Sequence, residues 1–141
     1  MNTPNRAQWI PAALFVGLVY LLAGLVFGRL AGSAASHQMT VAWRLAAWLI
    51  SAAAFGAHIG YENVRLRSSA RTTAFHVCLA VALGGFGLAV SANLHSYGTQ
   101  HRFPASALVI WPILTALPAF LVAWALAALL VRMRRGGQSA A

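Results

Sequence analysis

The stretch SALVIWPILTALPAFLVAWALAALLV, residues 106–131, contains no charged side chain and is long enough to cross a membrane. At a rise of about 1.5 Å per residue, roughly 20 apolar residues span a hydrocarbon core of about 30 Å as a helix. Three more long apolar runs occupy residues 9–30, 41–61 and 72–94, the first two with one arginine each. We therefore predict an all-α integral membrane protein, a single domain with four transmembrane helices in an antiparallel bundle and a disordered tail at 136–141.

The composition agrees with this prediction. Of 141 residues, 60% are hydrophobic and only 8% are charged, whereas a soluble domain needs more charge on its surface. All ten basic residues are arginine, and the formal net charge is +9. The arginines stand mostly at the ends of the apolar runs, where they set topology and attract anionic lipid headgroups. Because no basic run is interleaved with exposed stacking aromatics, we expect no nucleic-acid partner.

The arginines also predict how the chain is oriented in the membrane. One side of the membrane receives Arg6, Arg65, Arg67, Arg71, Arg132, Arg134 and Arg135, and the other receives Arg29, Arg44 and Arg102. By the positive-inside rule, both termini and the loop at 62–71 are cytoplasmic. We expect the protein in a bacterial cytoplasmic membrane.

Two details of the apolar runs leave alternatives open. Arg6 before the first run and the small residues GSAAS at 32–36 would also suit a cleaved signal peptide. The run at 9–30 is longer than the roughly 7 to 15 residues of a signal sequence, so we expect it to remain in the bundle. Pro112 and Pro118 fall inside the fourth run, and each removes a backbone donor, which predicts a kink or local loosening there.

A polar seam runs along the second helix and the third. At about 100° per residue, one face of the second helix carries Arg44, Ser51, His58, Glu62 and Arg65. One side of the third helix carries His76, several small residues and Ser91. A polar stripe facing lipid costs several kcal/mol, so it should face the bundle, a partner subunit or water. We predict that these two helices pack through the seam, with glycines in close approach.

Glu62 is the only acidic residue in the chain, and it lies at the inner end of this seam. His58 stands one turn before it, Arg65 follows three residues later, and His76 lies at a similar depth on the next helix. We predict that Glu62 accepts a hydrogen bond from His58 and pairs with Arg65, which would fasten the hairpin. His58, Glu62, His76 and Arg65 are also the candidate residues for a ligand or proton site.

Several functions fit these residues. A buried carboxylate beside titratable imidazoles suits a transport or permeation unit that encloses its path by oligomerisation, and the seam equally suits an assembly subunit of a membrane complex. His58 and His76 could be the axial ligands of a b-type haem, with His95 and either His37 or His101 as a second pair. A metal site of His58, Glu62 and His76 is weakened because Cys78 points about 200° away from His76.

Enzymatic activity has little support, because one carboxylate allows no acid–base pair and no Ser-His-Asp set. We therefore predict no catalytic residues. We expect a small non-enzymatic membrane protein, either a transport unit or an assembly subunit, without a cofactor and in a homo-oligomer or larger membrane complex. A b-type haem protein is the alternative.

Overall fold

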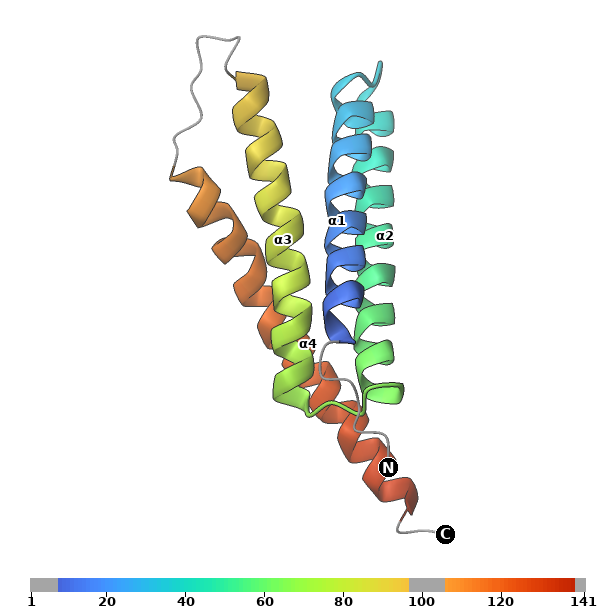
Figure 1. The fold of residues 1–141 in the computed structure, drawn as a ribbon. Helices are drawn as coiled ribbons and strands as arrows, with labels where there is room; N and C mark the ends of the chain where they lie inside the picture. The colour runs from blue at the N-terminus through green and yellow to red at the C-terminus, as the bar shows by residue number, and fades with distance from the viewer. Residues whose placement is uncertain (1–7, 97–105, 139–141) are drawn as a thin grey trace.

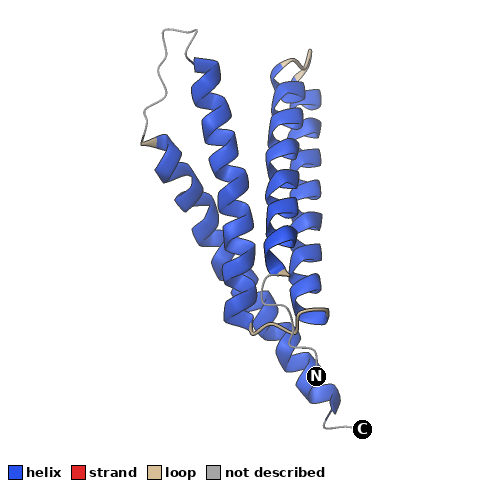
Figure 2. Cartoon of the chain, in the orientation of Figure 1, coloured by secondary structure: helices blue, strands red, loops and turns tan. Residues whose placement is uncertain are grey.

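The computed structural model describes residues 8–96 and 106–138. Within these ranges the chain forms four helices and no strand: α1 (Trp9–Gly32), α2 (His37–Val64), α3 (Ala70–Ser96) and α4 (Ala107–Gln138). Each helix is long and apolar enough to cross a membrane. The predicted all-α architecture of four membrane-spanning helices is confirmed, and Figure 2 shows helices joined only by short or undescribed connections.

The helices alternate in direction and form two hairpins, α1 with α2 and α3 with α4 (Figure 1). Helix α1 lies between α2 and α3, and it runs parallel to α3. Helix α2 packs mainly against α1 and meets α3 and α4 much less. The start of α1, the connection from α2 to α3 and the end of α4 all lie at one end of the bundle.

Serine side chains mark the starts of α2 and α3. The hydroxyl of Ser36 accepts a hydrogen bond from the backbone N–H of Met39 at 3.3 Å, and that of Ser69 accepts one from the N–H of Thr72 at 3.2 Å. Such caps satisfy donors that the first turn of a helix leaves free. Helices α2 and α3 extend beyond both ends of their predicted apolar runs, because the turns at the membrane surface tolerate polar residues.

Helix α4 is continuous through Pro112 and Pro118, the two prolines expected to disturb it. The hydroxyl of Thr115 donates to the carbonyl oxygens of Trp111 at 3.1 Å and Pro112 at 3.0 Å. The helix also continues to Gln138, past the point where the sequence suggested a disordered tail, and residues 139–141 lie outside the described range.

Small side chains fill the interior, while large ones cover the outside. One buried cluster joins α2, α3 and α4 through Ile59, Ala74, Val77, Ala123 and Ala127, and a second joins α1 and α3 through Ala13, Val16 and Ala80. By contrast, Trp48 and Leu49 on α2 are 75% and 71% exposed. This distribution suits a bundle in lipid, where close packing of small residues holds helices together and large apolar side chains can face the acyl chains.

Gly84 and Gly87 of α3 face α1, so the prediction that they pack against α2 is wrong, and Gly85 faces α4. A Cβ added at Gly84 would lie 2.6 Å from the Cβ of Tyr20, and one added at Gly87 would lie 2.9 Å from Leu21. On α2, a Cβ at Gly56 or Gly60 would meet no described atom within 4 Å. Glycine spacing indicates that a helix can approach closely, but it does not say which neighbour approaches.

Candidate functional site

Buried polar side chains gather at the end of the bundle where α2 ends and α3 begins. Those in the described ranges are His58, Glu62, Asn63, Thr73 and His76. They come from the last two turns of α2 and the first two turns of α3, which the short connection at 65–69 brings side by side. These five buried polar side chains therefore lie together at one end of the bundle.

Glu62 is the centre of this cluster, with none of its surface exposed. Its Oε1 lies 2.9 Å from Nδ1 of His76, and its Oε2 accepts a hydrogen bond of 2.7 Å from the hydroxyl of Ser68. An ionised carboxylate can only accept hydrogen bonds, so Nδ1 of His76 then carries the proton. Both oxygens of the only side-chain carboxylate in the sequence are thus occupied by hydrogen-bond partners.

Ser68 reaches Glu62 because the chain turns sharply at the end of α2. Arg67 adopts the left-handed backbone conformation, with φ at 50°. The turn directs the backbone N–H of Ser68 to the carbonyl oxygen of Glu62 at 3.1 Å, while its hydroxyl donates to the carboxylate. Ser68 therefore binds both the main chain and the side chain of the same residue.

His76 is held in place from α1. Its ring stacks on the indole of Trp9, with the ring centroids 4.2 Å apart and the planes 5° from parallel. A hydrogen bond on one edge and a stacked indole on one face together fix the orientation of the imidazole. Sequence reasoning assigned neither Trp9 nor Ser68 to the site.

His58 approaches the same carboxylate without forming a hydrogen bond to it. Its Nε2 lies 3.9 Å from Oε1 of Glu62, which is too long for the hydrogen bond that the spacing predicted. Both of its ring nitrogens are buried and have no hydrogen-bond partner within the described residues. His58 is thus an imidazole with unused donor and acceptor capacity beside a buried carboxylate.

Arg65 does not pair with Glu62, so that prediction is wrong. Its side chain is exposed, and the ion pairs of Glu62 in the described part of the chain are with His58 and His76 alone. Arg65 is the residue that caps the end of α2, where its backbone N–H donates to the carbonyl oxygen of Tyr61. The carboxylate points into the bundle, where a guanidinium could follow only by losing its contact with water.

The remaining candidates lie apart from this cluster. Arg44 is exposed near the opposite end of α2, about 27 Å from Glu62 along the helix at about 1.5 Å per residue. Ser51 is half-buried in the middle of α2. Ser91, also half-buried, lines a groove of about 300 Å³ between α1 and α3. The structure does not bring these three residues to Glu62.

The imidazoles predicted as cofactor ligands have different surroundings. His58 and His76 come from adjacent helices, as expected, and both face Oε1 of Glu62. His37 and His95 are exposed at the far ends of α2 and α3, and His101 lies outside the described residues. Cys78 is half-buried, and no three His, Cys, Asp or Glu side chains in the described ranges gather as a metal-binding group. Haem ligation stays a prediction.

Comparison with known proteins assigns no function to this chain, so the geometry of the site is the evidence for its function. No protein-family model, no curated protein and no solved structure matches the chain. The fold and the buried cluster, taken together, are those of a small polytopic membrane protein.

Proposed function

We propose that this membrane protein is a small proton-linked transport unit, in which Glu62, His76 and His58 bind and release a proton. One observation carries the proposal: the only side-chain carboxylate in the sequence is fully buried and faces two imidazoles, although ten arginines are present. If Glu62 only fastened the hairpin, a permanently charged guanidinium would be a sufficient partner for it. The imidazole partners instead make the charge of the site depend on protons.

The electrostatics of burial support this reading. An isolated ionised carboxylate is very costly in a medium of low dielectric constant, so it is neutralised by a partner charge or by a proton. Glu62 obtains such a partner only when an imidazole beside it is protonated, because no arginine in the described ranges reaches it. Imidazoles change charge near neutral pH, and ionisable groups within membrane helices commonly mark ion or proton pathways.

The distances suit stepwise proton transfer. His76 and Glu62 share a hydrogen bond of 2.9 Å, across which a proton can move directly. His58 lies 3.9 Å away, and a shift of about 1 Å would bring it within hydrogen-bonding range of the same oxygen. Because both of its ring nitrogens lack a partner among the described residues, His58 is free to accept a proton on one side and release it on the other.

A continuous path across the bilayer would need a second copy or a larger membrane partner. Helix α2 is the least covered helix, and none of its most apolar 18-residue window is buried. Its outer surface includes the exposed Ala52 and Gly56. We propose that α2 meets a neighbouring subunit there, and the stoichiometry of the purified complex in mild detergent tests this part of the proposal.

Proton flux in vesicles tests the function directly. The full-length protein is reconstituted with a pH-sensitive dye inside, and a potassium gradient with valinomycin drives protons across the membrane. We expect faster pH change than in protein-free vesicles, and loss of that excess in Glu62→Gln. Arg65→Gln is the matched control, because it removes a charge at the same end of α2 without touching the carboxylate. Flux that is equal in wild type and Glu62→Gln would refute the proposal.

Haem binding is the second candidate, and one observation favours it. His58 is buried, and neither of its ring nitrogens has a partner in the described part of the chain. Two histidines on neighbouring helices are a common way to hold a b-type haem inside a bundle. An absorption spectrum of protein expressed with sufficient haem tests this: a Soret band that disappears in both His58→Ala and His76→Ala would support it. A colourless protein would exclude it.

A further inference from the structure

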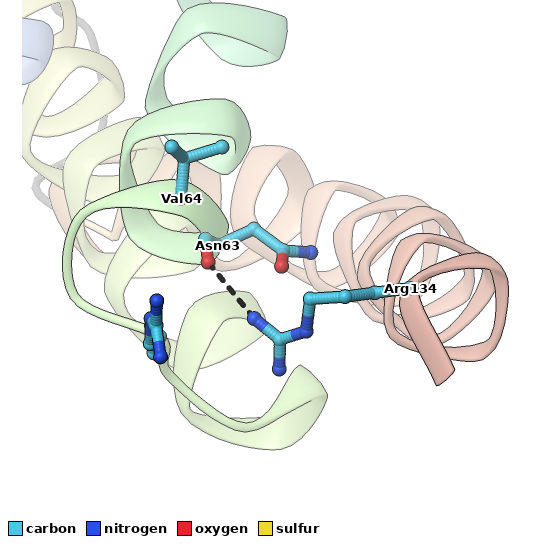
Figure 3. Close-up of a pocket in the computed structure, with 4 residues that line it drawn as sticks. Asn63, Val64 and Arg134 are labelled. Carbon is cyan, nitrogen blue, oxygen red and sulfur yellow. Dashed lines mark hydrogen bonds between the residues drawn. The ribbon is translucent and has the colours of Figure 1, made fainter. Parts of the chain in front are cut away.

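A second polar site lies at the same end of the bundle, next to the Glu62 cluster, with which it shares Asn63. A pocket of about 430 Å³ is lined by Asn63 and Val64 of α2, Arg67 of the α2–α3 connection and Arg134 of α4. Figure 3 shows Arg134 reaching across from α4 towards the main chain of Asn63. Three segments of the chain thus meet around one space.

The two arginines of this pocket have no acidic partner. The chain has a single acidic residue, Glu62, and its two oxygens are already bound by His76 and Ser68. Arg134 donates one hydrogen bond, from Nη1 to the carbonyl oxygen of Asn63 at 3.4 Å, and a guanidinium has five N–H donors. Within the described residues, Arg67 makes no hydrogen bond or ion pair. The pocket therefore holds two positive charges with unused donors.

Asn63 adds an uncharged donor to the same wall. The residue is only 6% exposed, and its Nδ2 is buried without a hydrogen-bond partner in the described part of the chain. A buried amide donor left unpaired costs stability, and it commonly marks a place where a water or a ligand binds. Two guanidiniums and an amide together offer the donors that phosphate oxygens accept.

The position of the pocket indicates where such a phosphate would come from. Helix α2 ends at Val64, so the pocket lies where the membrane-spanning helices reach the headgroup layer. Val64 is 74% exposed and gives the pocket an apolar edge beside its charges. An anionic lipid has this combination, with a phosphate attached to acyl chains.

We propose that this pocket binds one phosphate group through Arg67, Arg134 and Asn63, supplied either by an anionic phospholipid headgroup or by free phosphate. Arg134 keeps most of its donors available in this arrangement, because its one hydrogen bond, to the carbonyl oxygen of Asn63, uses a single N–H group. The site does not depend on proton transfer at Glu62.

The test uses the full-length protein, delipidated in mild detergent, and native mass spectrometry to count bound lipid. Short-chain phosphatidylglycerol is titrated against the wild type, with zwitterionic phosphatidylcholine, whose choline cation balances the phosphate charge, as the comparison. The variants are Arg134→Gln and Arg67→Asn, the second chosen because asparagine tolerates a positive φ. Arg132→Gln is the matched control, since it removes the same charge from the same end of α4 without lining the pocket.

We expect saturable binding of one phosphatidylglycerol per chain, weakened about fivefold or more by each pocket variant and little changed in Arg132→Gln. If inorganic phosphate binds with the same dependence on Arg67 and Arg134, free phosphate is the ligand; if only the lipid binds, the headgroup is. Equal binding of phosphatidylcholine, or an equal loss in Arg132→Gln, would overturn the proposal, because either result means diffuse attraction to the basic surface.

Discussion

Ser68 binds Glu62 at two points, because its hydroxyl donates to the buried carboxylate and its backbone N–H donates to the main-chain carbonyl oxygen. We expect Ser68→Ala to lower the free energy of unfolding by about 1–3 kcal/mol, since it leaves a buried carboxylate oxygen without a donor. Denaturation in mild detergent, followed by circular dichroism, measures this change. Arg65→Gln should leave the midpoint unchanged, because Arg65 is exposed and unpaired with Glu62. Equal losses in both variants would mean that the arginine does support the carboxylate.

Arg67 carries the one positive φ among the non-glycine residues that the structure describes. A left-handed conformation costs an ordinary L-residue roughly 1–2 kcal/mol, and a β-branched residue tolerates it less well still. We therefore expect Arg67→Gly to be more stable than Arg67→Val by about 1–2 kcal/mol, although both remove the same charge. Because both variants lose the same charge, the difference between their unfolding midpoints reports the cost of the left-handed backbone conformation. Equal stability would mean that the turn relaxes when the arginine is replaced.

Among single residues, sequence reasoning found the carboxylate and both imidazoles but not the groups that hold them. Helical spacing placed His58, Glu62 and His76 at one end of adjacent helices, because the angle and the rise per residue are regular. The bonds from Ser68 depend on an irregular turn, and the stacking of Trp9 depends on where α1 packs. Neither feature has a periodic signal in the sequence, so neither could be predicted.

Among the helices, α1 and α3 approach each other closely at Gly17 and Gly84. A Cβ at Gly84 would lie 2.6 Å from Tyr20 and 3.1 Å from the carbonyl oxygen of Gly17, so one backbone would have to move. We expect Gly84→Ala to destabilise the bundle by about 1–3 kcal/mol. Gly56→Ala is the matched control on α2, where an added Cβ meets no described atom within 4 Å. It should be neutral or stabilising by up to about 1 kcal/mol in a monomer.

The same pair of variants reports on the neighbour of α2. If Gly56→Ala costs as much as Gly84→Ala in the purified protein, then the open face of α2 is covered by another subunit. A stability difference between the two variants that changes with the detergent would indicate contacts between subunits. A difference that persists in every detergent would indicate contacts within one chain. A stable Gly84→Ala protein would contradict the close approach of α1 and α3.

The four helices could be predicted from the sequence, whereas which helices pack against one another could not. The apolar runs fixed four membrane-spanning helices, because lipid leaves the backbone of a long apolar segment no alternative of comparable cost. Gly84 and Gly87 of α3 were expected to meet α2 and instead meet α1. Contact between α2 and α3 is limited, which is why the predicted seam ends as a local cluster rather than a continuous interface.

The molecule as a whole concentrates its charge at one end. The end that holds the α2–α3 connection and the end of α4 carries Arg65, Arg67, Arg71, Arg132 and Arg134, whereas Arg29 and Arg44 lie towards the other end. The buried cluster and the arginine pocket share the first end. If that end faces the cytoplasm, as the positive-inside rule predicts, then the proposed proton site and phosphate site are both accessible from inside the cell.

Single cysteines test this orientation in a Cys78→Ala background expressed in bacteria. Ala35→Cys places a thiol in the exposed connection between α1 and α2, and Arg65→Cys places one at the opposite end of the bundle. We expect a membrane-impermeant maleimide to label Ala35→Cys in intact cells and Arg65→Cys only after the cells are opened, because the more basic end stays inside. The reverse pattern would put the arginine-rich end outside, where cytoplasmic lipid or phosphate could not reach the pocket. Labelling of both cysteines in intact cells would contradict a membrane crossing by α2 itself.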